Sequence, residues 1–243
     1  MSFVIVHCRV GRPNDCSQNN LFSRVDKSIF TKPVYKKLIS LYDNYINNIA
    51  VKEEVTAAER KEENDFIDEV MRSNVMKETL KFLRQENVFK KSENEFKDLL
   101  RQLWFDVYSR GQRILGSSGF EHVFLGEKKN GTVQGFHNWV YFYHLEQKNQ
   151  LNYLGHWTEV DLRGKGTGLS FTFKWDNDQK PFASMSIGTS PQFELALYTV
   201  CILVREEQDC RVSLSGKQFN VRTHIFKRPR GVKYVASAFI EWK

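Results

Sequence analysis

The spacing of hydrophobic residues changes near the middle of this chain. Between about residues 30 and 110 they recur every three or four positions, which is the period of an amphipathic helix. Beyond about residue 119 they alternate with polar residues or form short runs, which is typical of strands. The pattern predicts an α+β fold, in which an N-terminal helical block is followed by antiparallel β-sheets with packed helices.

The helical block carries recognisable start signals. Thr56 is followed three residues later by Glu59, and Ser92 is followed in the same way by Glu95. Each pair forms a capping box, in which two side chains satisfy backbone N–H groups at a helix start. The expected helical segments are residues 32–50, 56 to a break at 73–74, 75–88, and 92–107.

The second half reads as strands separated by turns. Leu169 to Trp175 alternates cleanly, as a half-buried strand does. Ser190 followed by Pro191 suggests an N-cap with proline in the first helical position, so a helix is expected over residues 193–204. The other expected strands are residues 151–157, 159–161, 183–188, 212–214, 218–226 and 232–240.

An Asn-Gly pair at Asn130 and Gly131 predicts a tight hairpin, because a type I′ turn needs two positive φ angles. A regular hairpin would place His122 opposite Trp139 and His137 on the same face as His122. Such diagonal neighbours lie roughly 7–8 Å apart at Cα. The two imidazoles could then hold a phosphate between them. Residues 138–147 could instead form a short helix.

Two imidazoles that share a face can act as general base and general acid near neutral pH. A positive charge is also needed to neutralise an oxyanion or phosphorane, and lysine supplies a point charge. Lys180 lies after a turn and before an expected strand, where a side chain could project over a sheet edge. Taken alone, each of these residues also fits an ordinary structural or surface role.

Composition sets limits on the type of protein. The chain has 243 residues, a net charge of +7 and a pI of about 9.1, a balance that favours an acidic partner such as nucleic acid. No stretch approaches the roughly 18 apolar residues of a membrane span. The four cysteines form no C-x-x-C pair, which argues against a zinc ribbon. Cys201 and Cys210 could be bridged or could be free buried thiols.

Several common site motifs are incomplete. His144-Leu145-Glu146 matches the H-x-E of zinc deaminases, but no P-C-x-x-C follows it. Gly216-Lys217 is followed by glutamine, so no Walker A motif is present. The glycines of residues 164–168 lack the G-x-G-x-x-G spacing and fit a turn between strands.

Several ordered motifs together resemble the EndoU family, the poly(U)-specific endoribonucleases. The resemblance covers roughly residue 21 to the C-terminus, whereas residues 1–20 do not resemble the usual N-terminal segment of the family. The motifs are Ser117-Ser118-Gly119-Phe120-Glu121-His122-Val123-Phe124-Leu125-Gly126-Glu127, Gly135-Phe136-His137-Asn138-Trp139, Lys180-Pro181 with Ser184, Ser190-Pro191-Gln192-Phe193-Glu194-Leu195-Ala196-Leu197-Tyr198, Val221-Arg222-Thr223 and Lys233-Tyr234-Val235-Ala236-Ser237-Ala238-Phe239.

This resemblance implies cleavage of single-stranded RNA at uridines, with a 2′,3′-cyclic phosphate and a 5′-hydroxyl as products. The family's two histidines correspond to His122 and His137, and its lysine corresponds to Lys180. His137 would deprotonate the 2′-hydroxyl, His122 would protonate the leaving 5′-oxygen, and Lys180 would stabilise charge on the phosphate.

The resemblance also implies a uridine pocket at Ser184, Ser237 and Phe239. Relatives usually carry Thr and Tyr where this chain has Ser237 and Phe239. Phe239 can still stack on uracil but lacks a phenol hydroxyl, so base preference could differ. Glu121 and Glu127 flank the first histidine and could tune it or help to bind a metal, or they could pair with neighbouring lysines.

By resemblance, Mn²⁺ or Ca²⁺ would stimulate the reaction, with ligands that remain unknown. The expected partner is single-stranded RNA that contains uridine, with no membrane, and the protein is expected to be a monomer. Without a visible signal peptide the sequence favours the cytoplasm, and secretion is the alternative if the N-terminus is incomplete.

The expected organisation is an N-terminal segment over residues 1–20, a helical subdomain over 21–115 and an α+β catalytic subdomain over 116–243, the latter two forming one domain. The alternative function is an RNA-binding protein of the same fold with weak or no catalysis. A third class, a partner-binding protein that uses the helical block, would show no RNA affinity.

Overall fold

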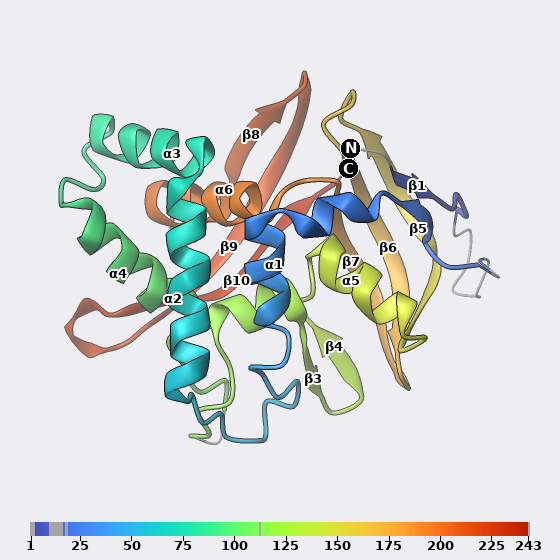
Figure 1. The fold of residues 1–243 in the computed structure, drawn as a ribbon, viewed down its shortest axis with the longest axis horizontal. Coiled ribbons are helices and arrows are strands. Elements are labelled where there is room, and N and C mark those ends of the chain that lie inside the picture. Colours follow the sequence, from blue (N-terminus) through green and yellow to red (C-terminus); the bar gives the residue numbers. More distant parts are fainter. Residues whose placement is uncertain (1–2, 10–16, 18, 112, 243) are drawn as a thin grey trace.

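A computed structural model describes residues 3–9, 17, 19–111 and 113–242. Helices gather on one side of the molecule, a five-stranded sheet lies on the other, and a three-stranded sheet lies between them (Figure 1). The α+β prediction is confirmed. The predicted turn around residues 11–15 and the cysteine at position 16 lie outside the described residues.

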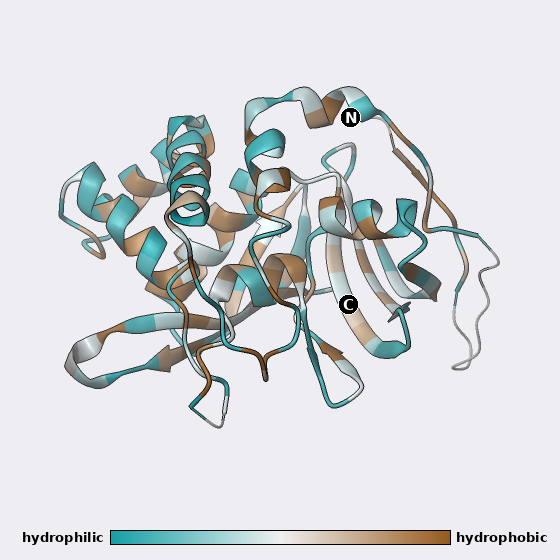
Figure 2. Ribbon diagram, turned by 60° about the horizontal axis from the view of Figure 1, so that its bottom comes forward, coloured by the Kyte–Doolittle hydropathy of each residue, from teal (hydrophilic) through white to brown (hydrophobic). Residues whose placement is uncertain are grey.

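The helical side contains the segments that the capping boxes predict. Thr56 and Ser92 each accept a hydrogen bond from the backbone N–H three residues on, and both boxes are complete. Brown hydrophobic positions of these helices alternate with teal ones around the axis (Figure 2). The helices are α1 (Pro33–Ser40), α2 (Ala57–Arg72), α3 (Asn74–Gln85) and α4 (Glu93–Trp104), with a 3₁₀ turn at Lys27–Thr31.

The helix predicted over residues 32–50 is wrong beyond Ser40, where α1 ends. The following stretch contains Asp and Asn residues, whose side chains offer the backbone alternatives to helical hydrogen bonds. The side chain of Asn48 accepts from the N–H of Ala50 at 3.0 Å, and Glu53 accepts from the N–H of Ile46 at 2.6 Å. The helix predicted over residues 92–107 is also too long, because α4 ends at Trp104.

The described residues form three sheets. The large sheet has the order β3-β4-β7-β6-β5, and its neighbours are antiparallel except for β4 and β7, which pair in parallel at Thr132 and Gln179. The second sheet has the order β10-β9-β8, and β1 pairs with β2. The strands are β1 (Phe3–Ile5), β2 (Phe22–Val25), β3 (Glu127–Lys129), β4 (Thr132–Gln134), β5 (Leu151–Asp161), β6 (Thr167–Trp175), β7 (Asp178–Ile187), β8 (Cys210–Leu214), β9 (Lys217–Lys227) and β10 (Lys233–Glu241).

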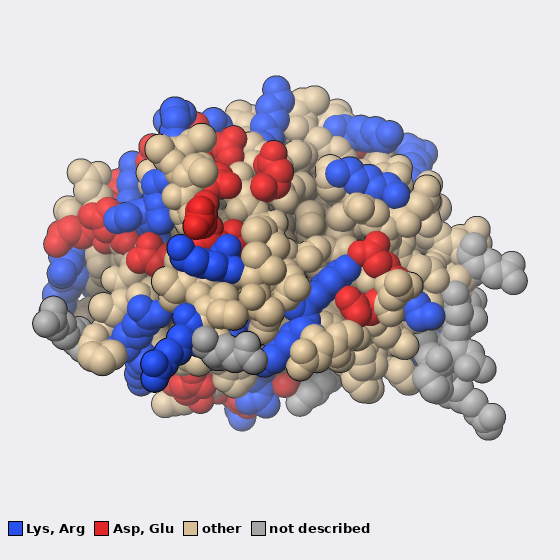
Figure 3. Space-filling model, turned by 90° about the horizontal axis from the view of Figure 1, so that it is seen from below, with Lys and Arg blue, Asp and Glu red and all other residues tan. Residues whose placement is uncertain are grey.

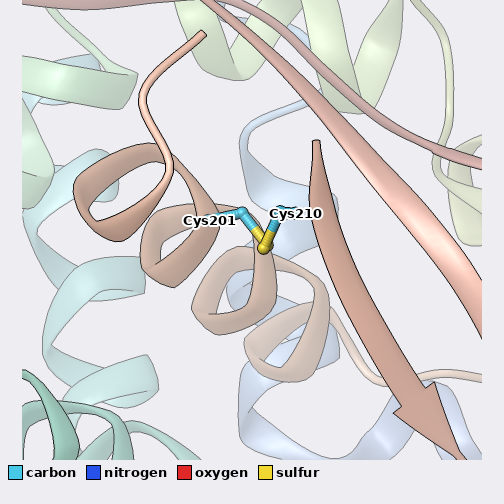
Figure 4. The surroundings of a disulfide bond; sticks show 2 residues. All are labelled: Cys201 and Cys210. Carbon is cyan, nitrogen blue, oxygen red and sulfur yellow. A yellow bond between two sulfur atoms is a disulfide. The ribbon is translucent and has the colours of Figure 1, made fainter. Parts of the chain in front are cut away.

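Two helices lie against these sheets. α5 (Trp139–Gln147) crosses the large sheet, so the alternative helix for residues 138–147 is the observed one. α6 (Pro191–Val204) packs against the second sheet and begins at Pro191, as predicted. A disulfide joins Cys201 of α6 to Cys210 of β8 (Figure 4), which resolves the two alternatives that the sequence left open.

The core is rich in aromatic rings and continues from the helical side into the large sheet. Phe120 stacks on Phe105 and on Phe124, with ring centroids 4.8 and 4.9 Å apart. Among the described residues, no helix is sufficiently long and apolar to cross a membrane. The packed rings matter for function because they anchor the segment that carries His122.

Candidate active site

His122 lies on a short π-helical turn, Glu121–Leu125, rather than on a strand. The turn begins where the hydroxyl of Ser118 accepts from the N–H of Glu121 at 3.1 Å. It ends where the N–H of Gly126 donates to the carbonyl of Glu121 at 2.7 Å, five residues back. Gly126 has a φ of +83°, and a Cβ there would lie 2.6 Å from the Cβ of Phe136. Turns of this type occur frequently at functional sites.

The predicted hairpin is therefore correct near its turn and wrong beyond it. β3 and β4 pair in the expected register, with Glu127 opposite Gln134. Past these residues the strands end, and the predicted pairing of His122 with Trp139 does not occur. Instead, the N–H of Phe136 donates to the carbonyl of His122 at 2.8 Å, and the N–H of His137 donates to that of Val123 at 2.7 Å. These two bonds connect the two histidine segments.

A buried carboxylate orients His122. Oε2 of Glu127 lies 2.6 Å from Nδ1 of the imidazole, and Nε of Arg110 lies 2.9 Å from the same oxygen. The hydroxyl of Ser117 donates to the other oxygen of Glu127. Nδ1–H of His122 therefore donates a hydrogen bond to Glu127. Nε2, the other ring nitrogen, is left to face a ligand.

The charges around His122 act in opposite directions. Burial lowers its pKa, hydrogen bonding to Glu127 raises it, and the Arg110 cation lowers it, with a net shift below the ordinary value. For Glu127, burial raises the pKa, but hydrogen bonding to His122 and the nearby cations outweigh it and lower the pKa overall. The carboxylate thus stays ionised beside the imidazole at neutral pH.

His137 has a neutral partner instead. Its Nδ1 lies 2.8 Å from the carbonyl oxygen of Ser184, so Nδ1–H donates and Nε2 is the free acceptor. Burial lowers the pKa of His137 to about 3, and the cation of Lys180 adds to this effect. The ring therefore stays neutral near pH 7, which is the state that a general base requires.

The residue after His137 fixes the chain direction. Asn138 caps α5 by accepting from the N–H groups of Val140 and Tyr141, both at 3.1 Å. Its amide donates to the buried carboxyl of Glu194 at 2.9 Å. Burial raises the pKa of Glu194 to about 8. The cap ties the backbone next to His137 to both α5 and α6.

Lys180 lies within β7 rather than before a strand, which corrects the sequence-based placement. Its Nζ is 3.4 Å from the carbonyl oxygen of Val133 on β4. Burial lowers the pKa of Lys180 to about 8. Its positive charge also lowers the pKa of both His122 and His137, so the three groups lie within electrostatic range of one another.

His137 and Lys180 open onto a pocket of about 510 Å³, whose lining includes Gly135, Ser184, Ser237 and Phe239. The ring of Phe239 stacks on the imidazole of His137, with centroids 5.3 Å apart and planes 17° apart. The three residues of the predicted uridine pocket thus line the same space as His137, the candidate general base, and Lys180. His122 lies beside it, because a Cβ added at Gly135 would be 2.9 Å from Cδ2 of His122.

Glu121 differs from Glu127, although the sequence suggested related roles. It is fully buried, and neither carboxyl oxygen has a hydrogen-bond partner within the described part of the chain. Burial raises its pKa well above the ordinary value, and the nearby carboxylates of Glu127 and Glu53 add to this effect. Within the described ranges, neither Glu121 nor Glu127 forms an ion pair with a lysine, and Lys128 pairs with Asp176 and Asp178.

The described residues do not identify ligands for the expected Mn²⁺ or Ca²⁺. Over the described ranges, no three His, Cys, Asp or Glu side chains are grouped so that they could hold a metal ion. Glu127 already bonds to His122, Arg110 and Ser117, and these bonds occupy its oxygens.

Comparison with protein families matches the model described as Endoribonuclease XendoU to residues 6–240. The chain belongs to this family. It is also similar to the solved structure of XendoU, a splicing-independent snoRNA-processing endoribonuclease, with a TM-score of 0.79 and 32% sequence identity over 99% of this chain and 88% of that one. The family resemblance seen in the sequence is thereby confirmed, as is the family fold, but the match begins at residue 6 rather than at about residue 21.

Curated relatives carry the name uridylate-specific endoribonuclease. The Homo sapiens protein is 40% identical over 223 residues, covering 90% of this chain and 54% of the relative. The Mus musculus protein is 39% identical over 233 residues, covering 95% and 56%. A Xenopus laevis protein, uridylate-specific endoribonuclease D, is 35% identical over 229 residues, covering 93% and 75%. The chain thus spans just over half the length of the two mammalian relatives.

Sequence reasoning missed several members of this XendoU-type site. Arg110 and Ser117 hold Glu127, yet no spacing rule connects Arg110 to a residue 17 positions later. Gly135 has a φ of +64°, and a Cβ there would lie 1.7 Å from the carbonyl oxygen of His122. A glycine two residues before a candidate histidine was a signal that could have indicated this close backbone approach.

Proposed function

We propose that this chain is an endoribonuclease that cleaves single-stranded RNA, preferentially at uridines, by attack of the 2′-hydroxyl on the adjacent phosphate. One observation carries the proposal: two buried imidazoles have different Nδ1 partners, Glu127 for His122 and the Ser184 carbonyl for His137. Both lie within electrostatic range of Lys180, which lines a pocket together with His137. Membership of the XendoU family and the names of the relatives support it.

In the proposed reaction, Nε2 of His137 accepts the proton of the 2′-hydroxyl, and the 2′-oxygen forms a bond to phosphorus. The bond between phosphorus and the 5′-oxygen breaks, and Nε2–H of His122 donates its proton to that oxygen. The products are a 2′,3′-cyclic phosphate and a 5′-hydroxyl. The ammonium of Lys180 offsets the negative charge that builds up on the phosphate oxygens. Because the nucleophile is a 2′-hydroxyl, DNA is not a substrate.

The uridine preference is proposed to come from Ser184, Ser237 and Phe239 on the pocket wall. Two hydroxyl groups can exchange hydrogen bonds with uracil, and the Phe239 ring offers a stacking face. Lys and Arg side chains are spread over the lower face of the molecule, with acidic side chains among them (Figure 3). The net charge of +7 favours contact with a phosphate backbone.

The proposal includes stimulation by Mn²⁺ or Ca²⁺, which rests on the family resemblance alone. No step of the reaction above is assigned to a metal. Cleavage by protein treated with a chelator, measured before and after each ion is added back, tests this part. An unchanged rate would remove the metal from the proposal and leave the histidine chemistry intact.

The decisive experiment uses a labelled oligonucleotide that contains one uridine, together with a copy that has 2′-deoxyuridine at that position. Cleavage of the first oligonucleotide alone, with a cyclic phosphate end, is expected.

His122→Ala, His137→Ala and Lys180→Ala should each reduce the cleavage rate about 10²-fold or more. Lys165→Ala, which changes an exposed lysine in the β5–β6 turn, is the matched control and should keep it. Full activity of His137→Ala would contradict the proposal, and RNA binding without cleavage would favour the inactive alternative.

A further inference from the structure

An exposed aromatic pair lies beside the pocket and has no part in the chemistry above. Phe182 on β7 is 71% exposed, and the other large hydrophobic side chains that are exposed in the described part of the chain are at most 49% exposed. The indole of Trp157 on β5 stacks on it, with centroids 5.5 Å apart and planes 26° apart. The two strands flank β6, so both rings stand on one face of the large sheet.

The local backbone holds this pair in place. The β6–β7 register shifts between Phe171 and Phe173, opposite Phe182, and the β5–β6 register shifts between His156 and Thr158, at Trp157. The hydroxyl of Thr172 donates to the carbonyl of Pro181 at 2.7 Å. Nε1–H of Trp157 donates to the Thr172 hydroxyl at 3.1 Å. Bulges of this kind redirect side chains near functional sites.

The Phe182 ring also belongs to the pocket. It lines the same space as His137, Lys180 and Phe239, and it follows Lys180 by two residues on β7. A phosphate held by Lys180 would therefore lie close to the Phe182 ring. The neighbouring base of the RNA would then lie within reach of that ring. An aromatic face accepts any base, because every base has a π-face.

We propose that Phe182, supported by Trp157, is a stacking platform for the base of a nucleotide that adjoins the scissile uridine. This inference rests on the proposed function, because it places the platform in the substrate path of the same pocket. The ordered stack matters because Trp157 restricts the Phe182 ring before RNA arrives, so that less rotational freedom is lost on binding. One exposed ring is small for a protein interface, which buries many residues on each side.

The test uses four oligonucleotides with a single uridine: one with all bases, one with an abasic site on the 5′ side, one with an abasic site on the 3′ side, and one with both. For the unaltered protein, removing the stacked base should lower kcat/KM about tenfold. Phe182→Ala should lower kcat/KM for the all-base substrate to that level and abolish the abasic effect. Phe182→Tyr should retain it. Whichever single abasic substrate, 5′ or 3′, is cleaved more slowly by the unaltered protein identifies the side on which the base stacks.

Phe82→Ala, which removes an exposed phenylalanine from α3 on the helical side, is the matched control and should behave as the unaltered protein does. An abasic effect that persists in Phe182→Ala contradicts the platform. So does an equal loss on all four substrates, because the ring would then contact the scissile uridine itself. Urea unfolding of each variant separates misfolding from lost stacking.

Failure of the platform and failure of the proposed function give different results. If the unaltered protein cleaves RNA, and Phe182→Ala keeps both the full rate on the all-base substrate and the abasic effect, the platform is wrong and the function stands. If the unaltered protein cleaves nothing, binding of the 2′-deoxyuridine copies, measured by fluorescence anisotropy, still tests the platform. Phe182→Ala must then bind the all-base copy about tenfold more weakly.

Discussion

The carboxylate of Glu127 lies 2.6 Å from Nδ1 of His122, in a setting where both side chains are buried. The other histidine of the site has a carbonyl oxygen in the corresponding position. A carboxylate favours the protonated form of an imidazole, whereas a carbonyl fixes the tautomer without favouring charge to the same degree. This difference in partners fits the opposite proton-transfer roles that we propose for the two rings.

Replacing Glu127 with Gln should lower kcat/KM for a uridine-containing oligonucleotide by about 10–100-fold. The substitution removes the anion that favours protonated His122, so the pKa of His122 should fall further. Since the proposed acid must carry a proton, activity is lost as pH rises through that pKa. The alkaline limb of a kcat/KM profile between pH 4.5 and 9 should therefore move to lower pH.

Glu206→Gln is a suitable control for this profile, because Glu206 pairs with Lys227 and Lys233 outside the pocket. It should leave the limb in place. A uniform loss of rate in Glu127→Gln with no movement of the alkaline limb would count against the acid role of His122.

The acid side of the profile should depend on Lys180. With a pKa of about 3, His137 remains a neutral base down to pH 5, so its protonation should not reduce kcat/KM between pH 7 and 5. Lys180→Ala removes a positive charge that disfavours protonated His137, so the pKa of His137 should rise. The residual activity of this variant should then begin to fall at higher pH on the acid side. An acid limb that is identical in the two proteins would contradict this coupling.

Gly135→Ala should damage both fold and activity. An alanine is strained at the φ of +64° that Gly135 adopts. The added Cβ would also lie 1.7 Å from the carbonyl oxygen of His122, so the two histidine segments must separate. Such strain is expected to cost about 1–3 kcal/mol of unfolding free energy, measured in urea. Gly164→Ala is the matched control: its φ is +79°, but nothing lies within 4 Å of the added Cβ. If both variants lose equal stability and activity, the close approach is not the cause.

Removing the Cys201–Cys210 disulfide should affect stability rather than chemistry. The bridge closes a short loop between α6 and β8, with a sequence separation of 9. For a loop of this length, a Cys201→Ala, Cys210→Ala variant should lose about 2–3 kcal/mol in urea unfolding. Its kcat/KM at 25 °C should stay within about twofold, because neither cysteine lines the pocket. A large loss of kcat/KM without a loss of stability would show that the bridge acts on the site.

Sequence alone determined those features that depend on near neighbours. The capping boxes at Thr56 and Ser92 were predictable because the donor and acceptor lie three residues apart, and the Asn130-Gly131 turn because it needs only two positive φ angles. Alternation predicted most of the long strands for the same reason. The family motifs named His122, His137 and Lys180, although their chemical roles stay predictions.

Tertiary structure decided how these residues meet. The partner of His137 is a carbonyl 47 residues away in sequence, and Lys180 approaches through β7. The hairpin register ends at Glu127 because Phe120 and Phe124 pack into the aromatic core and draw the chain into a π-helical turn. The exposed stack of Trp157 on Phe182 likewise depends on two strands that flank a third. Such contacts join residues distant in sequence, so no local period or spacing can specify them.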